Sequence, residues 1–125
     1  MRFFCDRALG RNVPNALKLR GIDAVAHDDL FDHKTGDDIW LAEIGRRGWT
    51  VLTKDNRMRF REAEKHALIS YKVGCFAIRQ GHATSEQMVA ILVSAWDKIE
   101  AISASEPRPF LYAVYKDGSV RKREL

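Results

Sequence analysis

Two acidic side chains follow short apolar runs of the chain. Asp6 comes directly after the run at residues 2–5, and Asp55 lies two positions beyond the run at residues 50–53. Carboxylates brought together repel one another and have raised pKa values unless a positive charge lies between them. A hard divalent cation with oxygen ligands, Mg²⁺ or Mn²⁺, suits such a site. It polarises phosphoryl oxygens and activates water.

The elements that must position these acids are predicted by the spacing of apolar residues. Short apolar runs favour buried strands, and recurrence every three or four positions favours helices. Strands are expected at residues 2–5, 23–27, 50–53 and 75–79. Helices are expected at residues 13–20, from Asp37 to near Gly48, at 58–72, and from the capping box at Thr84 and Gln87 through Ile102.

The last segment of the chain is typical of a β-hairpin. Residues 110–125 are two strand-like runs joined at Asp117 and Gly118, a strong short-range hairpin signal. Alternating strands and helices predict a mostly parallel sheet covered by helices on both faces. We therefore expect a three-layer α/β/α domain over residues 1–104, with a C-terminal β-hairpin over 105–125 that extends the same domain.

Topology predicts that distant acids meet at one edge of this sheet. In an open parallel sheet, ligands bind at the carboxyl ends of the strands. Asp6 and Asp55 follow two of these strand ends. Asp37 and Asp38 begin the helix that follows the second strand, so they start from the same edge. The sequence thus predicts a metal site with Asp6, Asp55 and one of the pair at 37 and 38.

Each acid also has a purely structural interpretation. Asp37 and Asp38 stand where a helix N-terminus favours negative charge, by about 0.3–1 kcal/mol each. Asp55 could form an ion pair with an arginine of the basic run that follows it. Asp6 has no obvious local partner. The conjunction of the acids, more than any one of them, indicates a site.

Basic residues surround the acid after the third strand. Arg57, Arg59 and Arg61 stand near the start of the predicted helix, where the helix dipole disfavours cations, so an external anion is expected there. Arg57 and Arg61 would share a helical face with Lys65 by their four-residue spacing. A nucleic-acid backbone lying along this ridge would reach the acids. A solvated helix face balanced by nearby glutamates is the alternative.

Composition limits the remaining possibilities. The 125 residues suit one domain, and 46% hydrophobic residues suffice for an ordinary core. The net charge of +4 favours polyanionic partners. No apolar stretch is long enough to span a membrane and no signal peptide is visible, so we expect a cytoplasmic protein without a membrane partner. Cys5 and Cys75 lie in apolar runs and are expected to be reduced and buried.

The segments FFCDRALG and HDDLFDHKTGDDIWLAEIGRRGWTVLTKDNRMRFREAEKHAL resemble the PIN-like nuclease family. The resemblance spans about residues 2–80 and is greatest to VapC-type toxins, in which a D-[DE]-x-W helix precedes a GW-x-x-LT-[KR]-D strand. It implies a three-layer α/β domain that hydrolyses RNA with Mg²⁺ or Mn²⁺, and an antitoxin protein as partner. The residues that it implies are the metal ligands and catalytic residues Asp6, Asp37 and Asp55 and the supporting residues Asp38 and Thr53. Independently of the resemblance, the basic run predicts the RNA-binding residues Lys54, Arg57, Arg59 and Arg61.

Two other functions are weighed beside the endoribonuclease. A PIN-like module that binds RNA or protein without cutting is one, because the family's usual acid near the end of the fourth strand has only Glu86 as a candidate here. A signalling receiver domain is the other; it would need an acidic pair after the first strand and a lysine after a fifth parallel strand, whereas Arg7 follows Asp6 and a hairpin is expected at the fifth position. The exposed edge of that hairpin also offers a route to a homodimer.

Overall fold

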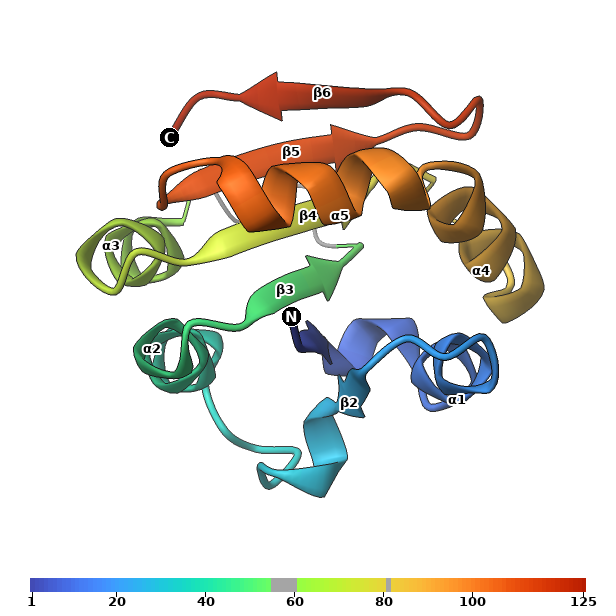
Figure 1. The fold of residues 1–125 in the computed structure, drawn as a ribbon. Coiled ribbons are helices and arrows are strands. Elements are labelled where there is room, and N and C mark those ends of the chain that lie inside the picture. Colours follow the sequence, from blue (N-terminus) through green and yellow to red (C-terminus); the bar gives the residue numbers. More distant parts are fainter. Residues whose placement is uncertain (55–60, 81) are drawn as a thin grey trace.

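A computed structural model describes residues 1–54, 61–80 and 82–125 of the chain, and Figure 1 shows a twisted sheet with helices on both sides. The strands are β1 (Phe3–Cys5), β2 (Ala24–Ala26), β3 (Thr50–Thr53), β4 (Gly74–Ile78), β5 (Phe110–Val114) and β6 (Val120–Arg123). The α-helices are α1 (Asn12–Leu19), α2 (Asp37–Arg47), α3 (Glu62–Ser70), α4 (Ser85–Ser94) and α5 (Trp96–Ser105). Single turns of 3₁₀-helix follow the first two strands: η1 (Arg7–Leu9) and η2 (His27–Asp29).

The six strands form one sheet in the order β2-β1-β3-β4-β5-β6. The first five are parallel to one another, and β6 pairs antiparallel with β5. The register sets Cys5 of β1 opposite Leu52 of β3. The next residues, Asp6 and Thr53, therefore lie side by side at the carboxyl ends of the two strands. The predicted fold class, a three-layer α/β domain with a mostly parallel sheet and a C-terminal hairpin, is confirmed.

Two hydrophobic cores lie on opposite faces of the sheet. On one face, α1, α4 and α5 pack over alternate strand residues such as Phe3 and Phe76. On the other face, α2 and α3 pack over Phe4, Val51 and Cys75. In Figure 1, α2 and α3 are seen to the left of the sheet, with α1 and α4 to the right. Burial of every residue of β1, β3, β4 and β5 explains why these strands are mostly apolar and do not alternate, with the two buried threonines of β3 as the polar exceptions.

The helix predicted after Thr84 is two helices. Its capping box is present, since Thr84 Oγ1 accepts from the Gln87 backbone N–H and Gln87 Oε1 accepts from the Thr84 backbone N–H. The helix then ends at Ser94, whose hydroxyl donates to the Ile91 carbonyl at 2.7 Å. That bond competes with the backbone ladder, and Ala95 leaves helical geometry (φ −100°, ψ 1°) before α5 begins.

The helix predicted over residues 58–72 begins later than expected. Arg61 has extended backbone (φ −90°, ψ 123°) and stands just before Glu62, the first residue of α3. Arg61 therefore lies at the N-cap of α3 and not within the helix, although its carbonyl accepts from the Lys65 backbone N–H at 2.8 Å. The basic ridge itself stays a prediction. The other residues of the expected start, 58–60, lie outside the described residues.

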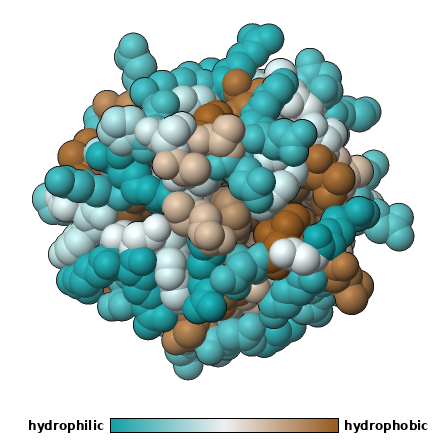
Figure 2. Space-filling model, in the orientation of Figure 1, coloured by the Kyte–Doolittle hydropathy of each residue, from teal (hydrophilic) through white to brown (hydrophobic). Residues whose placement is uncertain are grey.

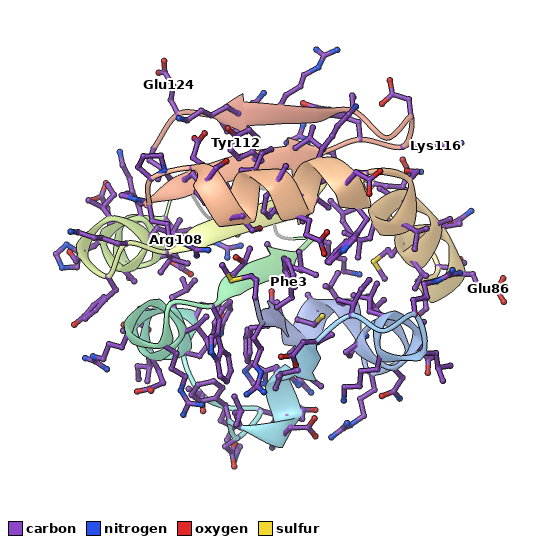
Figure 3. The ribbon with its side chains drawn as sticks, viewed as in Figure 1. Phe3, Glu86, Arg108, Tyr112, Lys116 and Glu124 are labelled. Carbon is purple, nitrogen blue, oxygen red and sulfur yellow. The ribbon has the colours of Figure 1, made fainter. Side chains whose placement is uncertain are left out.

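The C-terminal hairpin forms as predicted, with Gly118 at φ +84° in the turn. Its first strand, β5, is also the fifth parallel strand of the sheet, and Figure 3 shows Lys116 at the turn that follows it. The hairpin therefore gives no argument against a receiver domain. The other argument stands, because the residue after Asp6 is Arg7 and not an acid. Residues 106–109 connect α5 to β5, which lies in the same sheet as the four strands before it.

The cysteines lie in the interior, and the surface seen in Figure 2 is mostly hydrophilic. Both Cys5 and Cys75 are buried and form no disulfide, and burial raises the pKa of the Cys5 thiol to about 12. Figure 2 shows a mostly hydrophilic face with scattered hydrophobic side chains. In the described part of the chain, no helix has both the length and the apolar character needed to cross a bilayer.

A half-buried arginine joins three elements at the amino end of the sheet. The Arg108 guanidinium donates to the carbonyls of Trp49 and Ser103 and to the Thr50 hydroxyl at 2.8 Å. Figure 3 shows Arg108 beside the start of β4, where Gly74 lies. A Cβ at Gly74 would lie 2.5 Å from Phe110 Cζ and 2.6 Å from Arg108 Nη1. Only glycine leaves room for these side chains.

Gly74→Ala should therefore lower the free energy of unfolding, by about 1–3 kcal/mol, because the added methyl group overpacks this contact. Urea denaturation measures the loss. Phe110→Leu is the matched background, since it removes the ring atoms that the methyl group meets. There, Gly74→Ala should cost clearly less, a coupling expected of residues in contact. Equal costs in both backgrounds would contradict the packing explanation.

Candidate active site

The carboxyl ends of β1 and β3 carry a buried acid and the hydroxyl that binds it. Asp6 follows β1 and is only 7% exposed. The Thr53 hydroxyl, at the end of β3, donates to Asp6 Oδ2 at 2.7 Å. The backbone N–H of Asp6 also donates to the Leu52 carbonyl at 2.9 Å, which fixes the chain on leaving the sheet. The pairing of β1 with β3 thus places this carboxylate.

A second carboxylate comes from the first turn of α2. The indole N–H of Trp40 donates to Asp37 Oδ1 at 2.9 Å. Trp40 is fully buried on the face of the sheet that α2 covers, so it anchors this acid to the core. Asp37 Oδ2 lies 4.0 Å from a guanidinium nitrogen of Arg61. One carboxylate oxygen of Asp37 is therefore hydrogen-bonded to a core side chain, and the other lies near the Arg61 guanidinium.

Both acids line one cleft of about 710 Å³. Cationic side chains from four segments share its wall, and so do two histidines and small residues near the strand ends. The lining residues are Asp6, Arg7, Ala8, His27, His33, Thr35, Asp37, Lys54, Arg61 and Arg79. A few carboxylates surrounded by cations make a site that can bind a metal ion and the phosphate groups of an anionic ligand together.

The protein holds Asp6 in an unfavourable electrostatic environment. Burial raises the pKa of its carboxyl group, and the charge of Asp37 raises it further. The hydrogen bond from Thr53 and those from the backbone N–H groups of Arg7 and Ala8 act in the opposite direction, but the net pKa is raised. An acid buried at this cost in a cleft is typical of a functional site.

Two of the three predicted metal ligands are thus found at the cleft, together with Thr53, Lys54 and Arg61. Asp38, the neighbour of Asp37, lines a different cavity between α2 and α3. The structure therefore separates the two acids that the sequence could not distinguish. Their roles as ligands stay a prediction. The remaining predicted site residues, Asp55, Arg57 and Arg59, lie outside the described residues.

The described donors fit a hard cation that keeps part of its water shell. Within the residues that the structure describes, no group of three or more His, Cys, Asp or Glu side chains is placed to hold a metal ion. Asp6 and Asp37 supply two carboxylates, and Mg²⁺ is commonly held by one or two carboxylates together with waters and substrate phosphates. A cation between them would relieve the repulsion that raises the Asp6 pKa.

Six of the lining residues were not predicted from the sequence, and three of these, Arg7, His27 and Arg79, lie close to strand ends. His27 follows β2 and Arg79 follows β4, so the rule that located Asp6 would have found them as well. They were missed because the rule was applied to acids alone. Glu86, the candidate for an acid near the fourth strand, is exposed on α4, and Figure 3 shows it at the outer edge of the molecule, pointing away.

Comparison with known proteins gives one match. A family model described as a PIN-like domain matches residues 1–80, which include β1 through β4 and the acids Asp6, Asp37 and Asp55. Neither the curated proteins nor the solved structures contain a significant match to the chain.

Asp6→Asn should raise the free energy of unfolding at pH 7 in a metal chelator, by about 1 kcal/mol. Because the folded-state pKa of Asp6 lies above its unfolded value, its ionisation favours the unfolded chain. The wild type benefits from protonated Asp6 below the unfolded pKa and loses that benefit as the pH rises through the folded pKa. The advantage of the variant should therefore grow from acid to neutral pH. Urea denaturation across this range measures it.

Asp38→Asn is the control, because Asp38 is exposed and lies outside the cleft. It should leave the stability curve of the wild type almost unchanged. An Asp6→Asn variant that is less stable than the wild type at pH 7 in chelator would contradict the electrostatic description of the cleft.

Proposed function

This chain belongs to the PIN-like domain family, and we propose that it is a metal-dependent endoribonuclease that hydrolyses RNA phosphodiesters. One observation carries the proposal: the buried Asp6 carboxylate opens onto a cleft that it shares with Asp37 and with four cationic side chains. Nuclease activity is common among PIN-like domains. The proposal extends that general expectation to RNA and to these residues.

The chemistry divides between the acids and the cations of the cleft. Asp6, Asp37 and Asp55 would hold Mg²⁺ or Mn²⁺, with Thr53 fixing the orientation of Asp6 through its hydrogen bond. When bound, the cation supplies polarisation of a phosphoryl oxygen and acidification of a water molecule. Asp38 faces the neighbouring cavity, so its part would be limited to favouring the N-terminus of α2.

The cations supply the binding of substrate. Lys54 and Arg61 line the cleft on the side of β3 and α3, and Arg79 lines it from the end of β4. Arg57 and Arg59 lie in the segment between Lys54 and Arg61, so they would extend the same basic surface. Contacts to phosphate oxygens position a strand and carry little sequence information. The cleft would therefore set where the backbone is cut more than which bases are read.

A regulatory partner is a further part of this proposal. We infer that the protein acts as the toxin of a toxin–antitoxin pair and that an acidic segment of a partner protein occupies the cleft. Carboxylates of such a segment would pair with Arg7, Lys54 and Arg79. Among the described residues, Asp28 is an ion-pair partner of Arg7, and no carboxylate forms an ion pair with Lys54 or Arg79. A partner seated there would also block access to Asp6.

Asp6→Asn, Asp37→Asn and Asp55→Asn should each abolish Mn²⁺-dependent cleavage of a fluorescent single-stranded RNA. Each variant removes a negative charge that the cation needs, while the side chain keeps its shape. Asp38→Asn is the matched control, one residue from Asp37 but in another cavity, and it should cleave at the wild-type rate. Undiminished cleavage by Asp6→Asn and Asp55→Asn would remove the proposal.

Metal binding provides a second measurement that needs no turnover. Mn²⁺ should raise the melting temperature of the wild type and of Asp38→Asn, because a ligand that binds the folded state stabilises it. The shift should be small or absent in Asp6→Asn. A wild type that shows neither the shift nor cleavage, but still binds RNA, would favour a module that binds without cutting.

Lys54→Ala and Arg79→Ala should each weaken RNA binding in the non-cleaving Asp6→Asn background. Each lost phosphate contact should reduce the slope of log K against log salt by about 0.7 for a single strand. Fluorescence anisotropy at several salt concentrations measures both effects. Arg20→Ala is the control, because Arg20 follows α1 at the opposite end of the strands and makes the same change in net charge. Equal slopes for all three variants would exclude the cleft as the RNA-binding surface.

A further inference from the structure

A histidine held rigidly in the wall of the cleft has no part in the proposal above. His27 is the first residue after β2 and is 3% exposed. Its ring packs against three aromatic rings, with centroids 5.9 Å from Phe4, 5.7 Å from Phe31 and 6.1 Å from Trp40, the last in an edge-to-face arrangement. The ring is therefore fixed in position before any ligand binds.

The orientation of the ring is set by a carboxylate. His27 Nδ1 lies 2.9 Å from Asp28 Oδ1. This hydrogen bond is the main reason why the pKa of Asp28 is lowered, and an ionised carboxylate can only accept, so Nδ1 carries the proton. The Arg7 guanidinium lies 3.7 Å from the same oxygen and helps to hold the carboxylate in place. In the neutral ring, Nε2 is then an acceptor.

The second ring nitrogen of His27, Nε2, is available for a ligand in the cleft. Nε2 has no hydrogen-bond partner among the described residues. Among the described residues, two buried side-chain atoms have no hydrogen-bond partner, one in Ser103 and one in Glu106. Nε2 of His27 is not one of them. Nε2 is therefore not sealed from solvent, and His27 lines the cleft that contains Asp6 and Asp37. An imidazole with one nitrogen anchored by a carboxylate and the other facing the site is arranged as a proton acceptor.

We propose that His27 is the general base of the cleft and that Asp28 is its positioning residue. The inference rests on the proposed hydrolysis of RNA. The oxygen of a water molecule forms a bond to phosphorus, and one proton of that water moves to His27 Nε2. The bond between phosphorus and the leaving ribose oxygen breaks, and that oxygen takes a proton from solvent. The imidazolium formed is stabilised by the Asp28 carboxylate, and it returns its proton to solvent after release of the product.

The same ring is coupled to the acids through the core. The Trp40 ring packs edge-to-face with the His27 ring, and its indole N–H donates to Asp37. The base and one candidate metal ligand are thus positioned by a single buried side chain, which is the kind of shared support that keeps reacting groups in register.

His27→Gln and His27→Asn test the base in the full-length protein. Glutamine places a polar group near the position of Nε2, and asparagine places one near Nδ1, where it can keep the bond to Asp28; neither can accept the proton. Both variants should lower kcat by about 10²- to 10⁴-fold with little change in KM, and both should keep the Mn²⁺-induced rise in melting temperature. Cleavage of single-stranded RNA under steady-state conditions gives the two kinetic constants.

The outcomes separate the base from a structural role. Near-wild-type kcat in His27→Asn would mean that only the anchor to Asp28 matters, and it would overturn the proposal. Asp28→Asn is the second variant in case the first two do not fold. It should lower kcat by about 10- to 100-fold at unchanged KM, and an unchanged kcat would also overturn it.

Failure of the two proposals can be told apart. If the wild type cleaves RNA and the His27 and Asp28 variants cleave equally well, the general base is wrong and the ribonuclease stands. If the wild type does not cleave RNA while Asp6→Asn behaves like the wild type in Mn²⁺, the proposed function is wrong and this inference is overturned with it.

Discussion

Burial of the Asp6 carboxylate is the constraint on which the electrostatics of the cleft depend. A charged acid at the end of a buried strand is costly unless it is hydrogen-bonded or paired. Thr53 supplies one bond, and the backbone after β1 supplies others, yet the pKa of the carboxyl group is still raised. The fold therefore retains a destabilising charge at its centre. A cation bound in the cleft, as we propose, would offset this charge and link stability to ligand binding through one side chain.

Much of this arrangement could be predicted from the sequence, because parallel strands impose a simple geometry. Uniformly apolar runs identified the buried strands, and strand ends identified the edge at which Asp6 and Asp37 meet. The pattern could not distinguish Asp37 from Asp38, since adjacent residues at a helix start differ only in the direction of their side chains. That choice depends on the Trp40 indole, which binds Asp37 from the core.

The predictions that were wrong concern local backbone geometry. Apolar periodicity continues through Ala95, so the sequence favoured one long helix, but Ala95 has non-helical geometry (φ −100°, ψ 1°) and separates α4 from α5. Arg61 lies before α3 in extended backbone, where four-residue spacing had placed it on a helix. The backbone conformation of single residues, Ala95 and Arg61, sets these two boundaries, and residue spacing does not encode it. His27 was missed for a different reason, since the sequence placed it as the last residue of the strand expected at 23–27 and only acids were considered at the strand ends.

The aromatic cluster of Phe4, His27, Phe31 and Trp40 shows how core packing and site geometry are joined. Phe4 belongs to β1, and its ring contacts the three others, so the strand that ends at Asp6 also carries the centre of the cluster. The β1 strand thus positions Asp6 directly and, through these rings, the side chains that orient Asp37 and His27. A change in the packing of Phe4 would reach the acids and the imidazole together. The chemistry of the cleft is in this sense set by the hydrophobic face of one three-residue strand.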